Sequence, residues 1–228
     1  MNKTIKAVNE HIKPYGPGSY EKESIKKEIE RLKSTQIEIP IIINGQEIKT
    51  GNMADCIMPH NHNHVLGVYH QASEKEIKMA IESCLEAHKT WSTTSLEERC
   101  EIFQKMAELL QNEYRDIINA STMLGQSKNI FQAEIDSACE LIDFFKFNCQ
   151  YAQEIYSNQP CISPKGFKNH LEYRPLEGFV FAVTPFNFTS IAANLPSAPA
   201  IMGNVSIWKP ASSSVYSGHF LMQLFKEA

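Results

Sequence analysis

Two short apolar runs, each ended by a proline, limit most strongly what this chain can fold into. Gly178 to Thr184 is apolar almost throughout and stops at Pro185, and a second run from Asn204 to Lys209 stops at Pro210. An unbroken apolar run is typical of a strand that is covered on both faces, as in a parallel sheet. The runs alternate with helical patterns over Leu195–Met202 and Ser214–Ala228. This strand–helix–strand–helix order predicts an α/β fold with an open parallel sheet.

The segment before these strands is mostly helical in pattern. Ser73 with Glu76 and Ser95 with Glu98 form two capping boxes, and apolar residues at helical spacing follow each of them. The second of these helices is expected to continue to Tyr114. Two more helical patterns span Ser24–Leu32 and about Ile130–Tyr151, the latter with Ala138, Leu141, Ile142 and Phe145 facing inward. These amphipathic helices need a sheet or one another to cover their apolar faces.

Turn residues divide the rest of the chain. Asn44-Gly45 stands between two β-branched runs, which predicts a hairpin over Ile39–Ile48. A stretch rich in Pro, Gly and Ser, Cys161–Lys168, ends the helical region, and His170–Tyr173 is a candidate for a short strand. Residues 1–35 are polar and charged, so we expect an extension that lies on the surface of the main fold.

Charge and hydropathy exclude some classes of partner. The formal net charge of −4 is unlike that of a general nucleic-acid binder, which is usually basic. The chain contains no apolar run long enough to span a membrane. Its first residues carry lysine but neither arginine nor an apolar core, so we expect no secretory signal. The expected compartment is the cytoplasm, with the mitochondrial matrix as the alternative.

Cysteine and histidine invite metal or disulfide interpretations that the spacing does not favour. The six cysteines form no Cys-x-x-Cys pair and no disulfide framework, and Cys84, Cys100 and Cys139 fall at core positions of helices. His60, His62 and His64 alternate, but they follow a proline in a loop and have no acidic or cysteine ligand nearby. We therefore expect an exposed polar turn there and no metal site.

The chain carries no Gly-x-Gly-x-x-Gly fingerprint, P-loop or nucleophile elbow, so the strand ends are its main candidate site. Asn187 and Lys209 each follow a predicted strand at its carboxyl end, where open α/β sheets bind ligands. Residue chemistry alone leaves two interpretations open for the pair. Asn187 is either a ligand-facing amide or a turn residue that bonds its own backbone, and Lys209 is either a ligand contact or a solvated lysine.

The ordered residues of this region resemble the cofactor-binding signature of the aldehyde dehydrogenase family. The resemblance rests on Pro185–Phe188, the small-residue stretch with Ala198-Pro199-Ala200 and Gly203-Asn204, and Lys209-Pro210. Other segments resemble the 1-pyrroline-5-carboxylate dehydrogenase branch of that family: Pro59–His62, Thr122–Lys128, Gln132–Asp136, Glu140–Phe145, Leu176–Phe179 and Asn194–Asn204. The likeness covers roughly residues 14 to 228. It implies a partial Rossmann-like NAD-binding domain, together with part of an oligomerisation hairpin.

The resemblance also implies an activity and the residues nearest the chemistry. The activity is NAD-dependent oxidation of L-glutamate 5-semialdehyde, a small-molecule aldehyde, to L-glutamate in proline catabolism. By resemblance, Asn187 donates its amide to the oxyanion of the covalent intermediate. Phe188 and Glu140 match positions near the aldehyde tunnel. For Glu140 the alternative is a solvated or helix-capping carboxylate.

A second group of residues is implied to bind the cofactor. Thr184, Pro185 and Phe186 match the strand-end residues that line the nicotinamide ribose, and Lys209 matches the lysine that holds the adenosine ribose. Many family members carry Glu three residues after that lysine, where it disfavours a 2′-phosphate. NAD is the cofactor that the resemblance implies, but this chain has Ser212 at that position, and its short hydroxyl leaves room for NADP, which is therefore not excluded.

The resemblance departs from the family at its nucleophile. None of the six cysteines has the family's Gly-Gln-x-Cys context, and covalent hydride-transfer catalysis needs a thiolate. We therefore expect a truncated chain that is inactive alone, with an extension over residues 1–35, an incomplete cofactor domain over 36–228 and a hairpin segment over 162–175. The parent enzyme is expected to be a homo-oligomer. The alternatives are another aldehyde dehydrogenase branch and a short, non-catalytic binding module.

Overall fold

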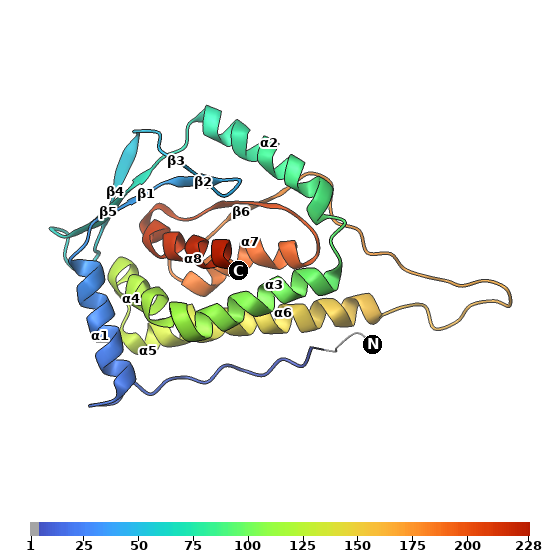
Figure 1. The fold of residues 1–228 in the computed structure, drawn as a ribbon, viewed down its shortest axis with the longest axis horizontal. Helices are drawn as coiled ribbons and strands as arrows, with labels where there is room; N and C mark the ends of the chain where they lie inside the picture. Colours follow the sequence, from blue (N-terminus) through green and yellow to red (C-terminus); the bar gives the residue numbers. More distant parts are fainter. Residues whose placement is uncertain (1–4) are drawn as a thin grey trace.

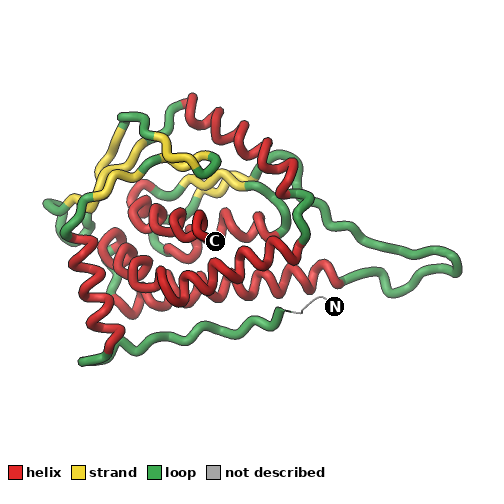
Figure 2. The backbone as a smooth tube through the Cα atoms, in the orientation of Figure 1, coloured by secondary structure: helices red, strands yellow, loops and turns green. Residues whose placement is uncertain are grey.

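The computed structural model describes residues 5–228, which form stacked layers of helices and small sheets. In Figure 1, helix α2 (Glu74–Trp91) and the β2–β3 hairpin lie above the strand β6 region, and helices α3 (Leu96–Leu109) and α6 (Glu140–Ser157) lie below it. A three-stranded sheet and α1 (Tyr20–Lys33) close one end, and a long loop extends from the other. Figure 2 shows that strands occupy only the upper half of the molecule. The predicted α/β fold is confirmed.

The first described residues run along the helical layer as an extended strap. The backbone N–H groups of Ile5 and Ala7 donate to the side chains of Gln153 and Gln150, each over 2.8 Å. Ser19 then caps α1, and this helix packs on α4 (Arg115–Gln126) with its apolar face. Ile25 and Leu32 of α1 are buried in the main core. The segment expected to lie on the surface therefore also contributes core residues.

Two small sheets follow α1. Strands β2 (Ile41–Ile43) and β3 (Gln46–Ile48) pair antiparallel around Asn44 and Gly45, which both have positive φ, and this confirms the predicted hairpin. Strands β1 (Ile37–Ile39), β5 (Val65–His70) and β4 (Met53–Ile57) form the other sheet in the order β1-β5-β4. A Cβ on Gly67 would lie 2.3 Å from the Ile37 carbonyl oxygen, so this sheet needs glycine there. This second sheet was not predicted from the sequence.

The helical layer consists of two long helical runs, each interrupted by a π segment. The first is α3 (Leu96–Leu109), a π turn at Leu110–Tyr114 and α4, and the second is α5 (Ile130–Ala133), a π segment at Glu134–Cys139 and α6 (Glu140–Ser157). The residues predicted to face inward in the second run are fully buried: Ala138, Leu141, Ile142 and Phe145. Both capping boxes, at Ser73 and Ser95, are present. Helix α4 was not predicted.

A buried ionic cluster fastens the strap to both helical runs. Arg115 of α4 donates to Glu134 over 2.5 Å and to Glu10 of the strap over 2.9 Å. Glu134 also accepts from the Tyr15 hydroxyl and the Asn119 amide. Burial opposes ionisation of Glu134, but the hydrogen bonds from Arg115, the Lys13 backbone and Tyr15, together with the Arg115 charge, outweigh it, so the pKa of this carboxyl lies below its usual value. Every charge of the cluster is therefore paired, as burial requires.

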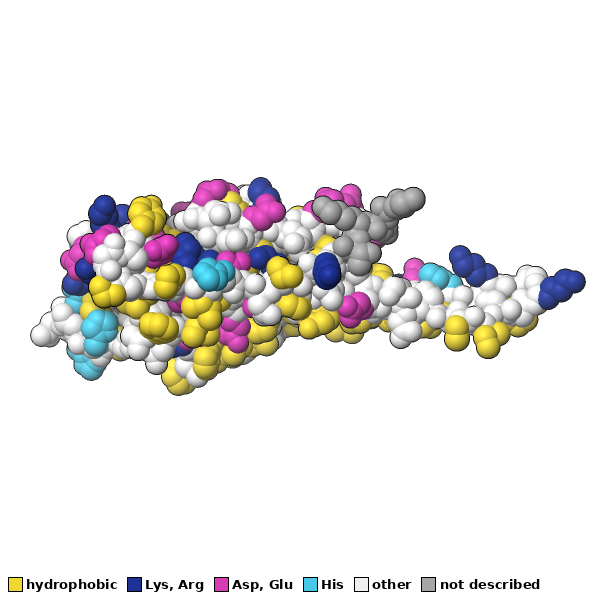
Figure 3. Space-filling view, turned by 90° about the horizontal axis from the view of Figure 1, so that it is seen from below, with side chains coloured by type: hydrophobic (Ala, Val, Ile, Leu, Met, Phe, Trp, Pro, Cys, Tyr) yellow, Lys and Arg dark blue, Asp and Glu magenta, His cyan; other side chains and the backbone are white. Residues whose placement is uncertain are grey.

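Residues 158–179 form an arm that leaves the body and returns to it (Figure 1). The predicted strand at His170–Tyr173 is wrong, because this segment has no neighbouring strand within residues 5–228 to pair with. The Gln159 side chain links the two sides of the arm through the backbone of Leu171, and Leu176 ties the arm to the body through bonds to Asn204 and His88. Exposed apolar side chains lie along it (Figure 3): Ile162, Phe167, Leu171 and Leu176.

The carboxyl-terminal third forms the predicted βαβα unit. Strand β6 (Val180–Val183) pairs parallel with β7 (Ser206–Lys209), helix α7 (Thr189–Ile201) connects them, and a short 3-10 turn (Ser212–Ser214) leads into α8 (Val215–Glu227). The expectation that β6 is covered on both faces is wrong for the described chain. Ala182 is buried, but Phe181 and Val183 are 59% and 56% exposed. Residues 5–228 therefore cover one face of this sheet and leave the other open.

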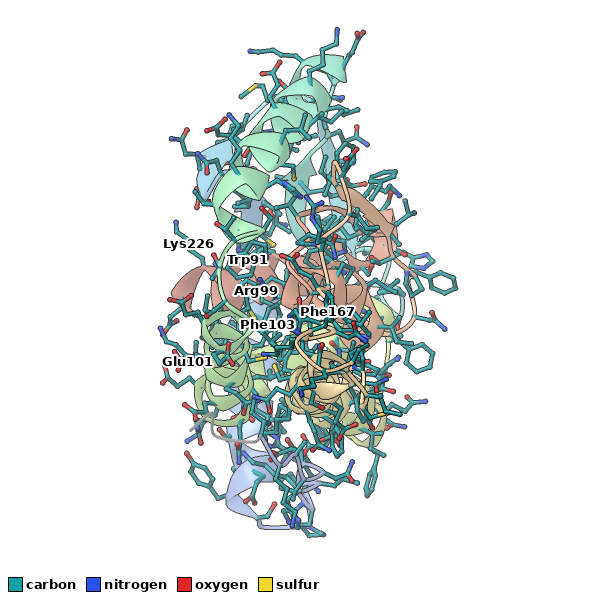
Figure 4. The ribbon with its side chains drawn as sticks, turned by 90° about the vertical axis from the view of Figure 1, so that its right-hand side faces the viewer. Trp91, Arg99, Glu101, Phe103, Phe167 and Lys226 are labelled. Carbon is teal, nitrogen blue, oxygen red and sulfur yellow. The ribbon has the colours of Figure 1, made fainter. Side chains whose placement is uncertain are left out.

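The end of α7 is fixed by side chains from the end of α2 and the first turns of α3. The Trp91 indole donates to the Ala200 carbonyl over 3.0 Å, and the Arg99 guanidinium donates to Ile201 over 2.8 Å. Figure 4 shows Trp91 and Arg99 on neighbouring elements beside α7. Carbonyl groups at a helix end lack intrahelical partners, and a cation there also favours the helix dipole. These contacts set the place of α7 and hence of the turn that precedes it.

Candidate functional site

The carboxyl ends of β6 and β7 lie at the same edge of the sheet. The strands are in parallel register, with Val183 opposite Lys209, and prolines follow both strands. Trp208 and Thr184 link the two ends, because the indole donates to the Thr184 hydroxyl over 2.9 Å. The Thr184 backbone N–H also donates to the Lys209 carbonyl. Thr184 was predicted to line a cofactor, and here it is buried and joins the two strand ends.

The turn after β6 presents its side chains to solvent. Phe186 and Phe188 are 64% and 37% exposed, and Asn187 between them is exposed as well. Pro185 is half-buried at the start of the turn. The Asn187 side chain makes no hydrogen bond within residues 5–228, so its amide is available to a ligand. The turn-residue alternative, in which this amide bonds its own backbone, is not what the structure shows.

Glu140 lies on the same side as this turn although it comes from the first turn of α6. Its carboxylate accepts a hydrogen bond from the Ser190 hydroxyl over 2.5 Å. Ser190 is in the first turn of α7, directly after the Asn187 turn. The structure thus brings together the residues predicted to lie nearest the chemistry. Glu140 is half-buried and bound to α7, which differs from the solvated or helix-capping alternative.

A hollow of about 1100 Å³ opens beside the end of β7. Lys209 and Ser212 line it, and apolar side chains of β7 and α8 form much of its wall. The apolar face predicted for α2 forms the opposite wall, with Ile77, Ala80, Ile81 and Cys84. Most of this face is exposed or half-buried, so α2 borders the hollow and does not close it. This volume is slightly above the range of about 300–1,000 Å³ that is typical of sites for small molecules, so the hollow has room for a dinucleotide.

The predicted site residues therefore fall into two groups. Lys209 and Ser212 line the hollow, whereas Asn187, Phe188 and Glu140 lie beside the turn after β6 and do not line it. The side chains of Lys209 and Ser212 make no hydrogen bond or ion pair within the described chain. The Lys209 ammonium is exposed, which fits a group that contacts a ligand.

Two residues beside the turn were given no role from the sequence. Lys128, between α4 and α5, donates to the main-chain carbonyl of Asn187 and forms an ion pair with Asp136. Burial lowers the pKa of the Lys128 ammonium, and the charge of Glu140 partly opposes this effect. Lys128 stands within a segment that carries the family resemblance, but its partners lie far along the chain and no spacing pattern reveals them.

Metal and membrane interpretations find no support in the part of the chain that the structure describes. Residues 5–228 hold no group of three or more metal-ligating side chains. The stretch with His60 and His62 forms the exposed turn between β4 and β5, as predicted. No helix within these residues is both long and apolar enough to cross a bilayer.

Comparison with known proteins agrees with this architecture. The sequence profile of the aldehyde dehydrogenase family matches residues 47–228, so the chain belongs to the aldehyde dehydrogenase family. The strand-end edge described above lies inside the matched region. The α/β fold with part of a cofactor-binding domain is therefore the fold of this family.

Within the family, the chain is similar to delta-1-pyrroline-5-carboxylate dehydrogenases. It is 45% identical over 96% of its length to a probable enzyme of that name from Schizosaccharomyces pombe, and 39% identical over 99% to the human mitochondrial enzyme. It spans about 40% of the length of each of these relatives. The crystal structure of the Mycobacterium tuberculosis enzyme bound with NAD superposes with a TM-score of 0.97 and 41% identity, covering 100% of this chain and 42% of that one.

Proposed function

We propose that the full-length protein carrying this chain oxidises L-glutamate 5-semialdehyde to L-glutamate with NAD as hydride acceptor. One observation carries the proposal: within the described residues, an amide-bearing turn follows one of two parallel strands in register, and a lysine without a side-chain partner ends the other. Open α/β sheets bind their ligands at such an edge. The names of the similar proteins support the substrate, and the NAD bound to the similar Mycobacterium tuberculosis enzyme supports the cofactor.

The residues at the end of β7 fit a dinucleotide. Lys209 supplies a charged hydrogen-bond donor for the hydroxyls of a ribose. The rest of the wall is largely apolar, which suits an adenine ring. Ser212 carries no negative charge, so it does not repel a 2′-phosphate, and NADP stays an alternative cofactor. Thr184, Pro185 and Phe186 are proposed to border the nicotinamide half. The cofactor, when bound, supplies the acceptor for the hydride.

The turn after β6 is proposed to serve the aldehyde. The exposed amide of Asn187 donates to the oxygen on which negative charge develops, and a donor of this kind is worth about 3–4 kcal/mol. Phe188 and Glu140 border the approach of the substrate. Their apolar and anionic groups suit a substrate that has an aliphatic chain and an α-ammonium group.

The apolar arm supports a proposal about assembly. Phe167 and Ile162 are 75% and 79% exposed on a segment held by few contacts within the chain. Exposed apolar side chains gathered on one projecting segment are typical of a protein contact. We assign residues 162–175 to a hairpin segment that joins copies in a homo-oligomer.

The mitochondrial names of several relatives support the matrix as the compartment, and the cytoplasm stays a prediction.

A kinetic comparison on the full-length protein tests the proposed function. The experiment follows NADH formation from glutamate semialdehyde and from propanal at matched concentrations. We expect kcat/KM to be at least about a hundredfold higher for the semialdehyde, which offers two more charged groups for binding. Equal kcat/KM values would assign the protein to another branch of the family. Absence of NADH with both aldehydes would favour a non-catalytic binding module, which reading the gene beyond codon 228 for a Gly-Gln-x-Cys motif tests independently.

A further inference from the structure

The turn that carries Asn187 is held from its carboxyl side by polar side chains of the helical layer. Thr189, the first residue of α7, is completely buried, and its hydroxyl lies 2.8 Å from that of Thr122. The Gln126 amide donates to the same Thr189 hydroxyl over 2.8 Å. Ser190 is bound to Glu140, as described above. These contacts fix the start of α7 but leave the two exposed residues before it to be held by something else.

Lys128 supplies that contact. Its ammonium donates to the main-chain carbonyl of Asn187 and lies 4.4 Å from the centroid of the Phe188 ring. Both contacts fall on the residues that form the exposed part of the turn. A cation over an aromatic face and a charged hydrogen bond are each stronger where water is partly excluded. The Lys128 side chain is only 15% exposed, so its contacts are of this kind.

The ammonium is itself held by Asp136 of the π segment. The Asp136 side chain is 9% exposed and forms an ion pair with Lys128 through one carboxylate oxygen. The other oxygen is buried and has no hydrogen-bond partner in the described chain. The free energy of a buried, ionised carboxylate with a single partner depends strongly on that partner, because its removal leaves an uncompensated charge. Lys128 and Asp136 therefore form one ion pair, and the Lys128 ammonium of this pair also binds the turn.

The backbone around Lys128 is fixed on both sides. Ser127 ends α4 in the left-handed conformation with φ 55°, and its hydroxyl lies 2.8 Å from the His60 ring. Asn129 caps α5 in a capping box with Gln132. Lys128 thus stands between a helix stop and a helix start, and neither end can shift without loss of a cap. This rigid base allows a long side chain to hold a turn at a defined place.

We propose that Lys128 is a positioning residue that holds the Asn187 amide in place for the reaction. The proposal rests on the proposed function of Asn187. A hydrogen-bond donor stabilises developing charge only when it is fixed before the charge appears. The contacts of Lys128 restrain the main chain of Asn187 and the ring of the next residue, and leave the Asn187 amide free to face the substrate. Lys128 acts through Asn187 and touches neither the aldehyde nor the cofactor.

Steady-state kinetics on the full-length protein test this role. Lys128→Met keeps most of the side-chain volume but removes the charge, and kcat should fall between about 10- and 100-fold, as for a misplaced catalytic group. KM for NAD should stay within about twofold, because Lys128 contacts Asn187 and Phe188 and not Lys209, the residue proposed to hold the adenosine ribose. Lys128→Arg keeps the cation and should recover most of the turnover. Lys78→Met, which removes a 68%-exposed lysine from a surface ion pair, is the matched control and should leave kcat unchanged.

A double-mutant cycle separates positioning from a general loss of structure. If Lys128 acts through Asn187, adding Lys128→Met to Asn187→Ala should lower kcat by less than about twofold further. Full multiplication of the two single losses would overturn the proposal, because the lysine would then act by another route.

A variant that removes both charges of the ion pair serves as the control for a loss of stability. Lys128→Met with Asp136→Asn leaves no unpaired buried charge, so it should melt close to the wild type even where Lys128→Met alone does not. Under the proposal, turnover of this double variant stays low although its stability is restored. Recovery of turnover together with stability would show that the lysine is merely structural.

Hydrogen exchange gives a readout that needs no substrate. Amides of residues 186–190 in the full-length protein should exchange at least about tenfold faster in Lys128→Met, and at the wild-type rate in Lys128→Arg and Asn187→Ala. Unchanged exchange in Lys128→Met would overturn the positioning role whatever the enzyme's substrate proves to be. Faster exchange in a protein that does not oxidise glutamate semialdehyde would instead leave the positioning role standing and reject the proposed function.

Discussion

The ends of the two parallel strands differ in how the rest of the chain holds them. The turn after β6 and the start of α7 are bound by side chains of α4, α6 and the loop between α4 and α5, through Gln126, Glu140 and Lys128. After β7, the side chains of Lys209 and Ser212 have no partner within residues 5–228. They lie on the wall of the hollow.

The difference between the firmly held turn after β6 and the open end of β7 corresponds to two functions, charge stabilisation and cofactor binding. A donor that stabilises a charge during reaction must be fixed beforehand, whereas a group that binds a long flexible cofactor only needs to be available. The polar network beneath the first turn supplies the rigidity, and the open hollow supplies the availability. We therefore expect changes at the first strand end to alter turnover and changes at the second to alter cofactor affinity.

The largest effect, on stability, should come from the buried ionic cluster around Arg115, which ties together the helical runs that hold the turn after β6. Arg115→Met leaves Glu134, at 1% side-chain exposure, buried without its cation, whereas Glu10 keeps its ion pair with Lys146. Breaking a buried pair in this way costs about 3–5 kcal/mol. The melting temperature of the full-length protein should therefore fall by several degrees, measured by calorimetry at neutral pH.

Arg31→Met is the control for this change. Arg31 pairs with Glu28 on the surface of α1 and is 55% exposed, so its loss should cost less than about 1 kcal/mol. Equal melting temperatures for the two variants would show that the buried cluster does not support the layer in the way we describe.

Asn187→Ala should have the next largest effect, on turnover. Loss of one oxyanion donor lowers kcat by about a hundredfold or more. The dissociation constant for NAD should change little, because the Asn187 side chain does not line the hollow and Lys209 is the residue proposed to hold the adenosine ribose. Steady-state kinetics with varied NAD on the full-length protein measure both quantities. Intact turnover would reduce Asn187 to a turn residue.

Lys209→Ala should act on the cofactor. Removing a charged hydrogen-bond donor costs about 1.5–3 kcal/mol, which corresponds to a rise of about tenfold or more in the dissociation constant for NAD. Turnover at saturating NAD should stay near that of the wild type. Fluorescence titration with NADH provides the affinity, and Lys226→Ala, on the exposed end of α8, is the control.

The smallest effect is expected at Ser212. Ser212→Glu places a carboxylate on the wall of the hollow, and repulsion of a 2′-phosphate by an exposed charge is worth about 1 kcal/mol. The ratio of kcat/KM for NADP to that for NAD should fall about fivefold. An unchanged ratio would place the 2′ position of the ribose away from this residue.

Local patterns predicted the parts of the fold that are held by neighbours in sequence. Asn44 and Gly45 form their turn, Ser73 and Ser95 cap their helices, and both strands of the βαβα unit pair as expected. Helix α4 was missed because it buries polar residues. Asn119 is fully buried, and its amide is satisfied by Tyr15 and Glu134, partners that periodicity cannot reveal.

The same limit applies to the site. Asn187 and Lys209 were found because Asn187 follows one strand and Lys209 ends the other, and strand ends can be read from the sequence. Lys128 was missed because its partners, Asp136 and the carbonyl of Asn187, meet only when two helical runs and a strand are packed together. The strand predicted at His170–Tyr173 failed for a related reason: a strand needs a partner, and its own sequence does not supply one.

The most direct test of the separation between the strand ends combines Asn187→Ala and Lys209→Ala in one full-length protein. NAD affinity from titration calorimetry and the single-turnover rate at saturating NAD are measured for the wild type, both single variants and the double variant. We predict that the double variant has the affinity of Lys209→Ala alone and the rate of Asn187→Ala alone, each within about twofold. An Asn187→Ala variant that loses NAD affinity, or a Lys209→Ala variant that stays slow at saturating NAD, would contradict this separation.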